Sequence, residues 1–370
     1  MIPLAFRNLF QNKMRLVISV GGVALALLLI LSLDAIFSGV EQRVTAYIDN
    51  SGADIWVSQD AVFNMHMASS SLRDSVARKV KTVEGVASVS PIMYLTNNVV
   101  AGDERNLAYI IGLPENAKLG RPWKLLVGRD LPEEGEVVMD RGVAEKSGIG
   151  LGDEVEILGE EFEVIGLSEE TSSLTNSIAF ISSKDFENMR QSYDTFSFLL
   201  VKVQNGESPD VVADRIEQKV RDVTAQTRTQ FAGQERKVIK DMSTDVITIM
   251  NLIGFLIGLA VMALTVYTST LSRRREYGML KALGAHSKDL YVTVLAQAII
   301  SVILGFFFGL FITLLLTLAL PLTPVNLTLE ISFTSLLKVG GFSLIIAAIS
   351  AVIPIRQIAG LDPAMVFRGK

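Results

Sequence analysis

The sequence lacks cysteine altogether and has only two histidines in 370 residues. Without cysteine, neither a disulfide framework nor a thiolate metal site is possible. His66 and His286 have no partner pattern for a catalytic triad or a zinc site. The one Gly-Lys dipeptide, Gly369-Lys370, ends the sequence, so a phosphate-binding P-loop is missing as well. We therefore predict no catalytic residue, no metal site and no cofactor-binding residue, and a chain that is not itself an enzyme.

One soft-ligand tripeptide stands apart from this pattern. Met65-His66-Met67 combines thioether and imidazole donors, which suit Cu(I). The competing interpretation is an ordinary loop with two apolar side chains and one polar side chain, and it is the one we favour.

Charge is distributed unevenly along the chain. Residues 40–245 contain 22 Lys/Arg and 34 Asp/Glu, a net charge of −12, whereas the remaining residues contain 12 and 5, a net charge of +7. The whole sequence is 49% hydrophobic with a mean hydropathy of +0.41, which is too apolar for an ordinary soluble enzyme. This asymmetry indicates an acidic soluble domain joined to a basic-flanked membrane part.

Four apolar segments can span a bilayer, which requires roughly 20 residues as a helix. A signal peptide is the alternative for the first segment, but the segment is too long for the apolar core of one. The second would be about 40 Å long as a helix, so it exceeds a hydrocarbon core of roughly 30 Å. We place the four transmembrane helices at 15–39, 246–271, 290–320 and 339–355.

Orientation follows from the basic residues in the short segments between spans. The N-terminal stretch 1–14, the loop 272–289 and the tail 356–370, with Arg15 at the first boundary, hold 11 Lys/Arg, whereas the loop 321–338 holds one. Because basic loops stay in the cytoplasm, both termini and the 272–289 loop are expected there, with the acidic domain and the 321–338 loop outside.

The spans contain almost no ionisable side chains. Asp34 lies near the outer end of the first span, and the other three have none in their interior. Ion-coupled transporters usually need charged residues near the midplane, so a secondary transporter is disfavoured. Small residues at four-residue spacing instead predict close helix packing, within or between subunits, at Gly254, Gly258, Gly305 and Gly309, and at Gly22 with Ala26.

The acidic region 40–245 reads as a mixed α/β domain. We predict strands at 53–59, 87–94, 97–101 and 108–112, short strands after them, a small helix near 141–147, and a final strand at 196–203 followed by a helix. The two ends of the region are expected to pair into a porter-like subdomain, 40–115 and 195–235, around a β-rich insert, 116–194. A polar helical stalk, 224–245, then leads into the second span.

The basic loop after the second span is the most distinctive segment. As a helix, it places Tyr277, Leu280, Leu283 and Gly284 on or near one face, with Arg274, Lys281 and Lys288 elsewhere. A helix lying on the membrane surface and a helix docking into a partner's groove both fit this pattern.

Residues 274–285, RREYGMLKALGA, resemble the signature R-E-x-G-x-L-+-A-x-G-A of the MacB/LolC/FtsX-like ABC transporter permeases, the type VII or mechanotransmission class. LAFRNLFQNKMRL near the N-terminus and PIRQIAGLDPAMVFR near the C-terminus also resemble that family. The four-span layout with one large outer domain matches over the whole chain and is close to the DevC-type exporter permeases.

The resemblance implies a permease subunit that couples ATP hydrolysis by a separate cytoplasmic ATPase to movements of its extracytoplasmic domain. The cargo would be a lipid, lipoprotein, peptide or other amphiphile, exported or extracted; the alternative is an FtsX-like regulator of an extracytoplasmic cell-wall hydrolase. Expected partners are the ATPase with its ATP and Mg, a second permease copy, membrane lipids, and a membrane-fusion adaptor or a hydrolase, but no nucleic acid. The expected location is the bacterial cytoplasmic membrane, with 1–14 as an amphipathic helix on its inner surface.

The resemblance also assigns the ATPase-coupling role to the helix within 272–289. Tyr277 stands where the family usually has an aliphatic residue, so we expect it to influence the choice of partner. The residues carried over are Arg274, Arg275, Glu276, Tyr277, Gly278, Leu280, Lys281, Ala282, Gly284 and Ala285.

Overall fold

The computed structural model describes residues 6, 10–11, 13–102, 104–171, 177–320 and 329–359. The chain divides into a helical unit, Met1–Gly39, Ser243–Leu322 and Thr328–Lys370, and a sheet unit, Val40–Met242 and Thr323–Leu327. Most of the predicted helix 1–14 lies outside the described residues, as do 321–328 of the predicted outer loop and 360–370 of the predicted tail.

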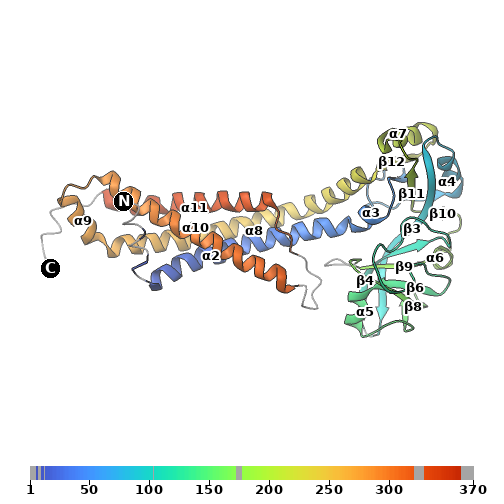
Figure 1. The fold of residues 1–370 in the computed structure, drawn as a ribbon, viewed down its shortest axis with the longest axis horizontal. Helices are drawn as coiled ribbons and strands as arrows, with labels where there is room; N and C mark the ends of the chain where they lie inside the picture. The colour runs from blue at the N-terminus through green and yellow to red at the C-terminus, as the bar shows by residue number, and fades with distance from the viewer. Residues whose placement is uncertain are drawn as a thin grey trace. The chain divides into compact units, whose positions relative to one another are not determined.

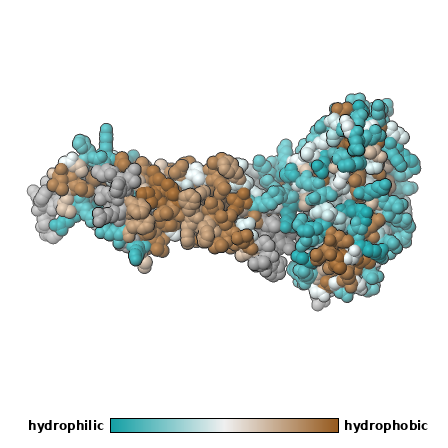
Figure 2. Space-filling model, viewed as in Figure 1, coloured by the Kyte–Doolittle hydropathy of each residue, from teal (hydrophilic) through white to brown (hydrophobic). Residues whose placement is uncertain are grey.

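Four long helices form the helical unit, and their segments within it run side by side (Figure 1). All four are long and apolar enough to cross a membrane, and Figure 2 shows a largely hydrophobic surface along them. Leu27, Met262, Val294 and Ile346 are fully buried between them. The helices are α2 (Lys13–Val44), α8 (Arg228–Ser272), α10 (Ser287–Ala319) and α11 (Phe333–Ala359), with the short α9 (Arg274–Ala282) between α8 and α10.

Helix α11 begins at Phe333, before the predicted start of the fourth span at 339. The side chain of Ser332 explains the earlier start, because its hydroxyl oxygen accepts a hydrogen bond from the Ser335 amide at 3.1 Å and caps the first turn.

A polar contact joins α2 to α11. Asp34, 8% exposed, accepts a hydrogen bond from the Ser335 hydroxyl and pairs with Lys338, whose Nζ lies 3.0 Å from Asp34 Oδ1. Lys338 thus gives Asp34 a cationic partner, as a carboxylate in apolar surroundings requires.

The sheet unit is built on one ten-stranded mixed sheet, ordered β12-β1-β11-β3-β4-β9-β6-β8-β5, with β7 paired to β3 and β8. Strands from both ends of the region meet in it, because β1 pairs antiparallel with β11 and β12. The strands are β1 (Ile55–Gln59), β2 (Leu72–Arg73), β3 (Val86–Ala101), β4 (Glu104–Leu113), β5 (Leu125–Gly128), β6 (Glu136–Asp140), β7 (Glu154–Ile157), β8 (Glu160–Ser168), β9 (Ser177–Ser182), β10 (Thr195–Phe196), β11 (Phe198–Val203) and β12 (Val223–Thr227); the helices are α3 (Ala46–Asn50), α4 (Asp74–Lys81), α5 (Arg141–Ser147), α6 (Ser183–Arg190) and α7 (Pro209–Lys219).

The long strand β3 corrects the two separate strands predicted at 87–94 and 97–101. Its first half pairs with β11 up to Ile92, and its second half pairs with β4 from Met93 to Ala101. Leu95 and Thr96, the gap between the two predicted strands, pair with Ile110 and Tyr109 of β4 and stay extended. The sheet also continues without a break from the predicted porter-like subdomain into the predicted insert, because β4 pairs with β9, and the boundary between them stays a prediction.

The start of the predicted stalk is also corrected, because Val223–Thr227 is strand β12 and not helix. All five residues are buried and pair with β1, which outweighs their polar composition. Helix α8 then starts at Arg228 behind a capping box: the Thr227 amide donates to Gln230 Oε1 at 3.0 Å, and the Gln230 amide donates to Thr227 Oγ1 at 3.4 Å.

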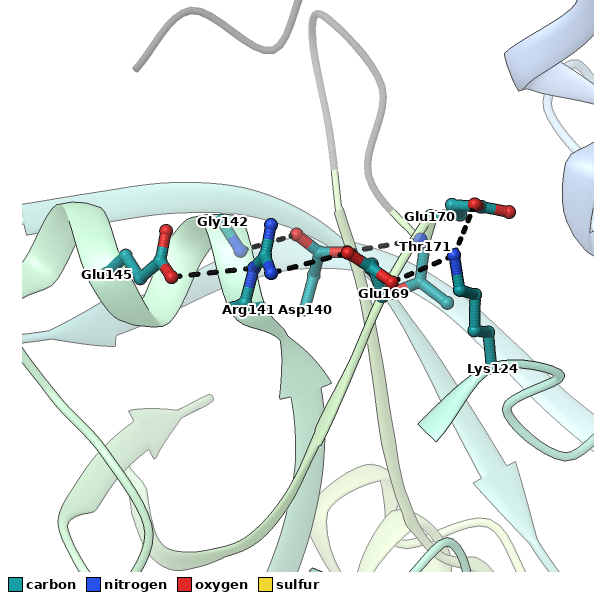
Figure 3. A network of polar contacts seen from close by, with 8 residues as sticks. All are labelled: Lys124, Asp140, Arg141, Gly142, Glu145, Glu169, Glu170 and Thr171. Atoms are coloured by element: carbon teal, nitrogen blue, oxygen red, sulfur yellow. Dashed lines mark hydrogen bonds and ion pairs between the residues drawn. The ribbon is translucent and has the colours of Figure 1, made fainter. Parts of the chain in front are cut away.

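Polar contacts tie the β5, β6 and β8 end of the sheet together (Figure 3). Buried Asp140 accepts hydrogen bonds from the Gly142 amide at 2.8 Å and from the amide and hydroxyl of Thr171 at 3.1 and 2.7 Å. Lys124 Nζ lies 2.8 Å from Glu169, and their hydrogen bond lowers the pKa of that carboxyl. These contacts hold the end of β6, the residues after β8 and the residue before β5 together.

Candidate functional site

The candidate coupling element is α9, which follows α8 after a break at Arg273. It ends in a Schellman turn: the Ala285 amide donates to the Leu280 carbonyl at 2.9 Å, and the Gly284 amide donates to the Lys281 carbonyl at 3.1 Å. Gly284 has a φ angle of +95°, a backbone conformation that residues with a Cβ rarely adopt. Residues 280–285 of the motif therefore form the backbone turn that ends α9, and the positive φ of this turn favours glycine at position 284.

Tyr277 is not a surface residue. Its side chain is 1% exposed and belongs to the apolar core of the helical unit, together with Leu290 and Val294 of α10. Burial raises its pKa, opposed by the nearby Arg273 guanidinium, so the phenol is uncharged. This corrects the expectation that Tyr277 meets the partner and influences its choice: the aromatic ring anchors α9 inside its own chain.

Lys281 likewise serves the chain's own fold. Its ammonium donates to the carbonyls of Ile358 and Ala359 at 3.3 and 3.2 Å, which are among the last of α11. A cation at a helix C-terminus is favoured by the unpaired carbonyls and the helix dipole. Gly278 is buried and Leu280 half-buried, so these motif residues also face inward.

At the start of α9, Arg273 is 8% exposed. Its guanidinium pairs with Glu276 at 3.2 Å and donates to Gln11 Oε1 at 2.9 Å. The N-terminal stretch, where it is described at Gln11, therefore contacts the coupling element.

The remaining motif residues lie on the outside. Leu283 is 85% exposed and Met279, one turn earlier, is 45% exposed. Arg274, Arg275, Glu276, Ala282 and Gly284 are exposed, and Ala285 is half-buried. A cavity of about 130 Å³ adjoins this surface and is lined by Thr270, Leu271, Arg274, Gln357 and Ile358. We call Met279, Leu283 and the exposed residues 274–276 the outer face of α9.

The four glycines predicted to pack helices all contact α2, and Gly258 contacts α11 as well. A Cβ at Gly254 would lie 2.7 Å from Ile30, and one at Gly258 would lie 3.1 Å from Ile346 and 3.2 Å from Ala26. On α10, a Cβ at Gly305 would lie 2.8 Å from Val23, and one at Gly309 would lie 3.0 Å from the Ala24 carbonyl oxygen. These contacts are within one chain, and they make α2 the helix around which α8 and α10 close.

The first turns of α8 are fixed inside the sheet unit. Phe231 is fully buried and stacks on Trp56, with ring centroids 4.9 Å apart. Glu235, also fully buried, accepts hydrogen bonds from the Met65 amide at 2.8 Å and from His66 Nδ1. On the next residue, Arg236 pairs with Asp49 at 2.8 Å. The sequence analysis missed this anchor, because Glu235 and His66 lie 169 residues apart and no local pattern links them.

The same contacts decide the role of the Met65-His66-Met67 tripeptide. His66 Nδ1 is engaged by Glu235, Met65 is 5% exposed and Met67 is 65% exposed, so the three side chains lie in different surroundings. In the described part of the chain, no group of three or more His, Cys, Asp or Glu residues could hold a metal ion. The geometry favours the ordinary-loop interpretation.

Two family models match the chain: the MacB-like periplasmic core domain over residues 16–219 and the FtsX-like permease C-terminal over residues 248–363. The first covers more than half of the chain, and the chain belongs to the MacB/FtsX family of ABC transporter permeases. This confirms the predicted family and fold class, a multi-pass membrane protein with an α/β domain between its first and second apolar helices.

The curated relatives match over their full length. An uncharacterized ABC transporter permease of Mycobacterium bovis is 20% identical over 371 residues, covering 100% of both chains. Another from Methanocaldococcus jannaschii is 23% identical over 405 residues, covering 100% of this chain and 98% of the relative. An ABC transporter permease implies a partner ATPase.

Two solved structures resemble the sheet unit. The periplasmic region of MacB from Actinobacillus actinomycetemcomitans matches with 18% identity and a TM-score of 0.39, over 52% of this chain and 97% of that one. The extracellular domain of the noncanonic ABC-type transporter YknZ from Gram-positive bacteria matches with 14% identity and a TM-score of 0.37, over 47% and 98%.

We predict that Gly309→Val destabilises the protein by roughly 1–3 kcal/mol, because the new side chain would meet the α2 backbone, which has little room to move. Gly341→Val on α11 is the matched control, since a Cβ there meets nothing within 4 Å. Thermal unfolding of the two purified variants in the same detergent measures the difference. Equal midpoints for both would contradict the assigned packing.

We predict that Tyr277→Ala costs roughly 3–5 kcal/mol of stability by leaving a cavity in the core, whereas Tyr277→Phe costs about 1 kcal/mol or less. The same unfolding assay and limited proteolysis after Leu283 report the loss of α9 packing. If Tyr277→Ala unfolded like the native chain, Tyr277 would not be the anchor of α9.

Proposed function

We propose that this chain is the membrane subunit of a mechanotransmission ABC transporter. In this proposal a separate cytoplasmic ATPase docks on the outer face of α9, and its closure is carried along α8 to the sheet unit outside the membrane. Two copies of the chain would flank one ATPase pair. Both termini and α9 would then be cytoplasmic, as the basic residues of the short segments favour.

The observation that carries the proposal is the continuity of α8. One helix of 45 residues, about 67 Å long, runs from Arg228, three residues before the aromatic anchor Phe231, to Ser272, the residue before the Arg273 break. This exceeds a hydrocarbon core of roughly 30 Å, so the helix extends well beyond a bilayer. An unbroken helix with its start fixed by Phe231, Glu235 and Arg236 can transmit displacement with little internal bending.

The outer face of α9 supports the docking role. Leu283 is almost fully exposed at the end of α9. Tyr277 and Lys281 hold the opposite side of this helix against the rest of the chain. A rigidly mounted apolar side chain flanked by charges is the pattern of a helix that fits a partner's groove. The inward residues therefore set the pose of the helix, and the outward residues would contact the ATPase.

The cargo would be a lipid, lipoprotein, peptide or other amphiphile, moved outside the bilayer by the sheet unit. The interiors of the four spans carry almost no charge, which fits a subunit that opens no polar path between its own helices. The match to the MacB-like periplasmic core domain over residues 16–219 favours this role over an FtsX-like regulator of a hydrolase. Copurification of an adaptor or of a hydrolase would separate the two.

We expect Leu283→Glu and Glu276→Lys each to reduce permease-stimulated ATP hydrolysis by about tenfold or more, because both alter a docking contact. Hydrolysis would be measured on the copurified permease–ATPase complex in lipid nanodiscs. Leu283→Met is the conservative control and should keep most of the stimulation. Undiminished stimulation in both charged variants would exclude α9 as the docking element. ATP hydrolysis by the purified permease alone would contradict the proposal that a separate subunit is the ATPase.

We expect Met242→Pro to uncouple the sheet unit while leaving the ATPase docked. Met242 is 68% exposed on α8, so proline there interrupts the helix at a cost of about 3 kcal/mol or more without emptying a core. Because the chain has no cysteine, the substitution Arg221→Cys introduces a single site for a spin label in each copy. Nucleotide should change the distance between the two labels in Met242→Ala but not in Met242→Pro. The same change in both variants would contradict the proposal that α8 transmits the movement to the sheet unit.

A further inference from the structure

A cavity of about 420 Å³ lies in the sheet unit, within the size range of small-molecule sites. Its walls come from the 65–71 segment after β1, the middle of β3, the end of α6 and the β10–β11 turn. The permease role proposed above assigns nothing to it.

The most buried lining residues are apolar, and the exposed ones include polar side chains as well as Met67. Met93, Phe186 and Phe198 are at most 6% exposed, whereas Ser69 and Arg190 are exposed. Arg190 is the only Lys or Arg of the lining, and none of the lining residues is Asp or Glu. In a domain with a net charge of −12, a cavity without a lining carboxylate and with a guanidinium is chemically distinct.

His66 adds a polar group that the fold does not use. Its Nδ1 faces Glu235, while its Nε2 is buried and has no hydrogen-bond partner among the described residues. A buried polar atom without a partner is costly and calls for a ligand or a water. With Nδ1 donating to the carboxylate, Nε2 accepts a hydrogen bond when the ring is neutral and donates one when it is an imidazolium.

From this geometry we propose that the cavity is a binding site for a small anionic molecule with an apolar, aromatic-sized body. The anionic group, a carboxylate or a phosphate, pairs with Arg190 at the exposed side and takes further hydrogen bonds from the serines there. The body lies on Phe186 and Phe198. Its edge reaches His66 and so contacts the side chain that holds Glu235 at the start of α8.

Other ligand classes fit less well. A cation would meet Arg190 without a lining carboxylate to offset it. A wholly apolar ligand would cover the hydroxyls of the lining without giving them partners. An anion without an apolar body would leave the buried aromatic floor uncovered.

The test uses the full chain in lipid nanodiscs and four probes that share one ring system: naphthalene-2-carboxylate, 2-naphthyl phosphate, naphthalene-2-carboxamide and 2-naphthylmethylamine. Binding is measured by saturation-transfer NMR and titration, with empty nanodiscs subtracted to remove partition into lipid. Ser69→Trp places an indole at the exposed side of the cavity. Arg190→Gln removes the cation, and Arg221→Gln, an exposed arginine outside the cavity, is its matched control.

We expect at least one of the two anions to bind, about tenfold or more tightly than the amide, with the amine weakest. Carboxylate-only or phosphate-only binding identifies the head group and supports the site. Arg190→Gln should weaken anion binding about tenfold, Ser69→Trp should abolish it and Arg221→Gln should leave it unchanged. The proposal is overturned if neither anion binds, if the amide or the amine binds as tightly, or if the Arg190 and Ser69 variants bind like the native chain. None of these readouts involves ATP hydrolysis, so they stand or fall apart from the proposed coupling.

Discussion

The stacking of Phe231 on Trp56 is the contact on which the architecture depends. Trp56 lies in β1, between β11 and β12, and is fully buried. Phe231 is in the first turn of α8, so the stack joins β1 to the helix that continues into the helical unit. Tyr47 and Phe198 surround the tryptophan edge-on, which gives the joint an aromatic core of its own. Without it, α8 would begin as an unsupported polar helix.

The motif at residues 274–285 contains inward-facing and outward-facing side chains that its sequence does not separate. Periodicity placed Tyr277, Leu280 and Leu283 on or near one face, and the structure splits them: Tyr277 is buried, Leu280 half-buried and Leu283 almost fully exposed. The reason is the break at Arg273, which sets the rotation of α9 about its own axis relative to α10. A helix wheel gives spacing but not this rotation. Lys281 shows the same limit, because its acceptors at the end of α11 are distant in sequence.

Much of the fold could be predicted, since apolar length and basic flanks mark the four long helices and alternation marks most strands. The errors lie where tertiary pairing outweighs local composition. Val223–Thr227 is polar by sequence and buried as a strand because β1 needs a partner on its outer side. Leu95 and Thr96, predicted as a gap between two strands, stay extended because β4 pairs with β3 from Met93 to Ala101. The contacts of Glu235 with His66 and of Asp34 with Lys338 join residues far apart along the chain, and only the folded topology brings them together.

The unbroken course of α8 also restricts how such a chain can change length during evolution. One residue added to an α-helix turns everything beyond it by about 100° and shifts it by about 1.5 Å. Within the helical unit, Gly254 meets Ile30 and Gly258 meets Ala26, so a single residue inserted between these two glycines would rotate one of them away from its contact. Lengthening between them is tolerated only in steps near a whole number of turns. The four-residue spacing of these glycines is therefore constrained by the helix that both of them contact.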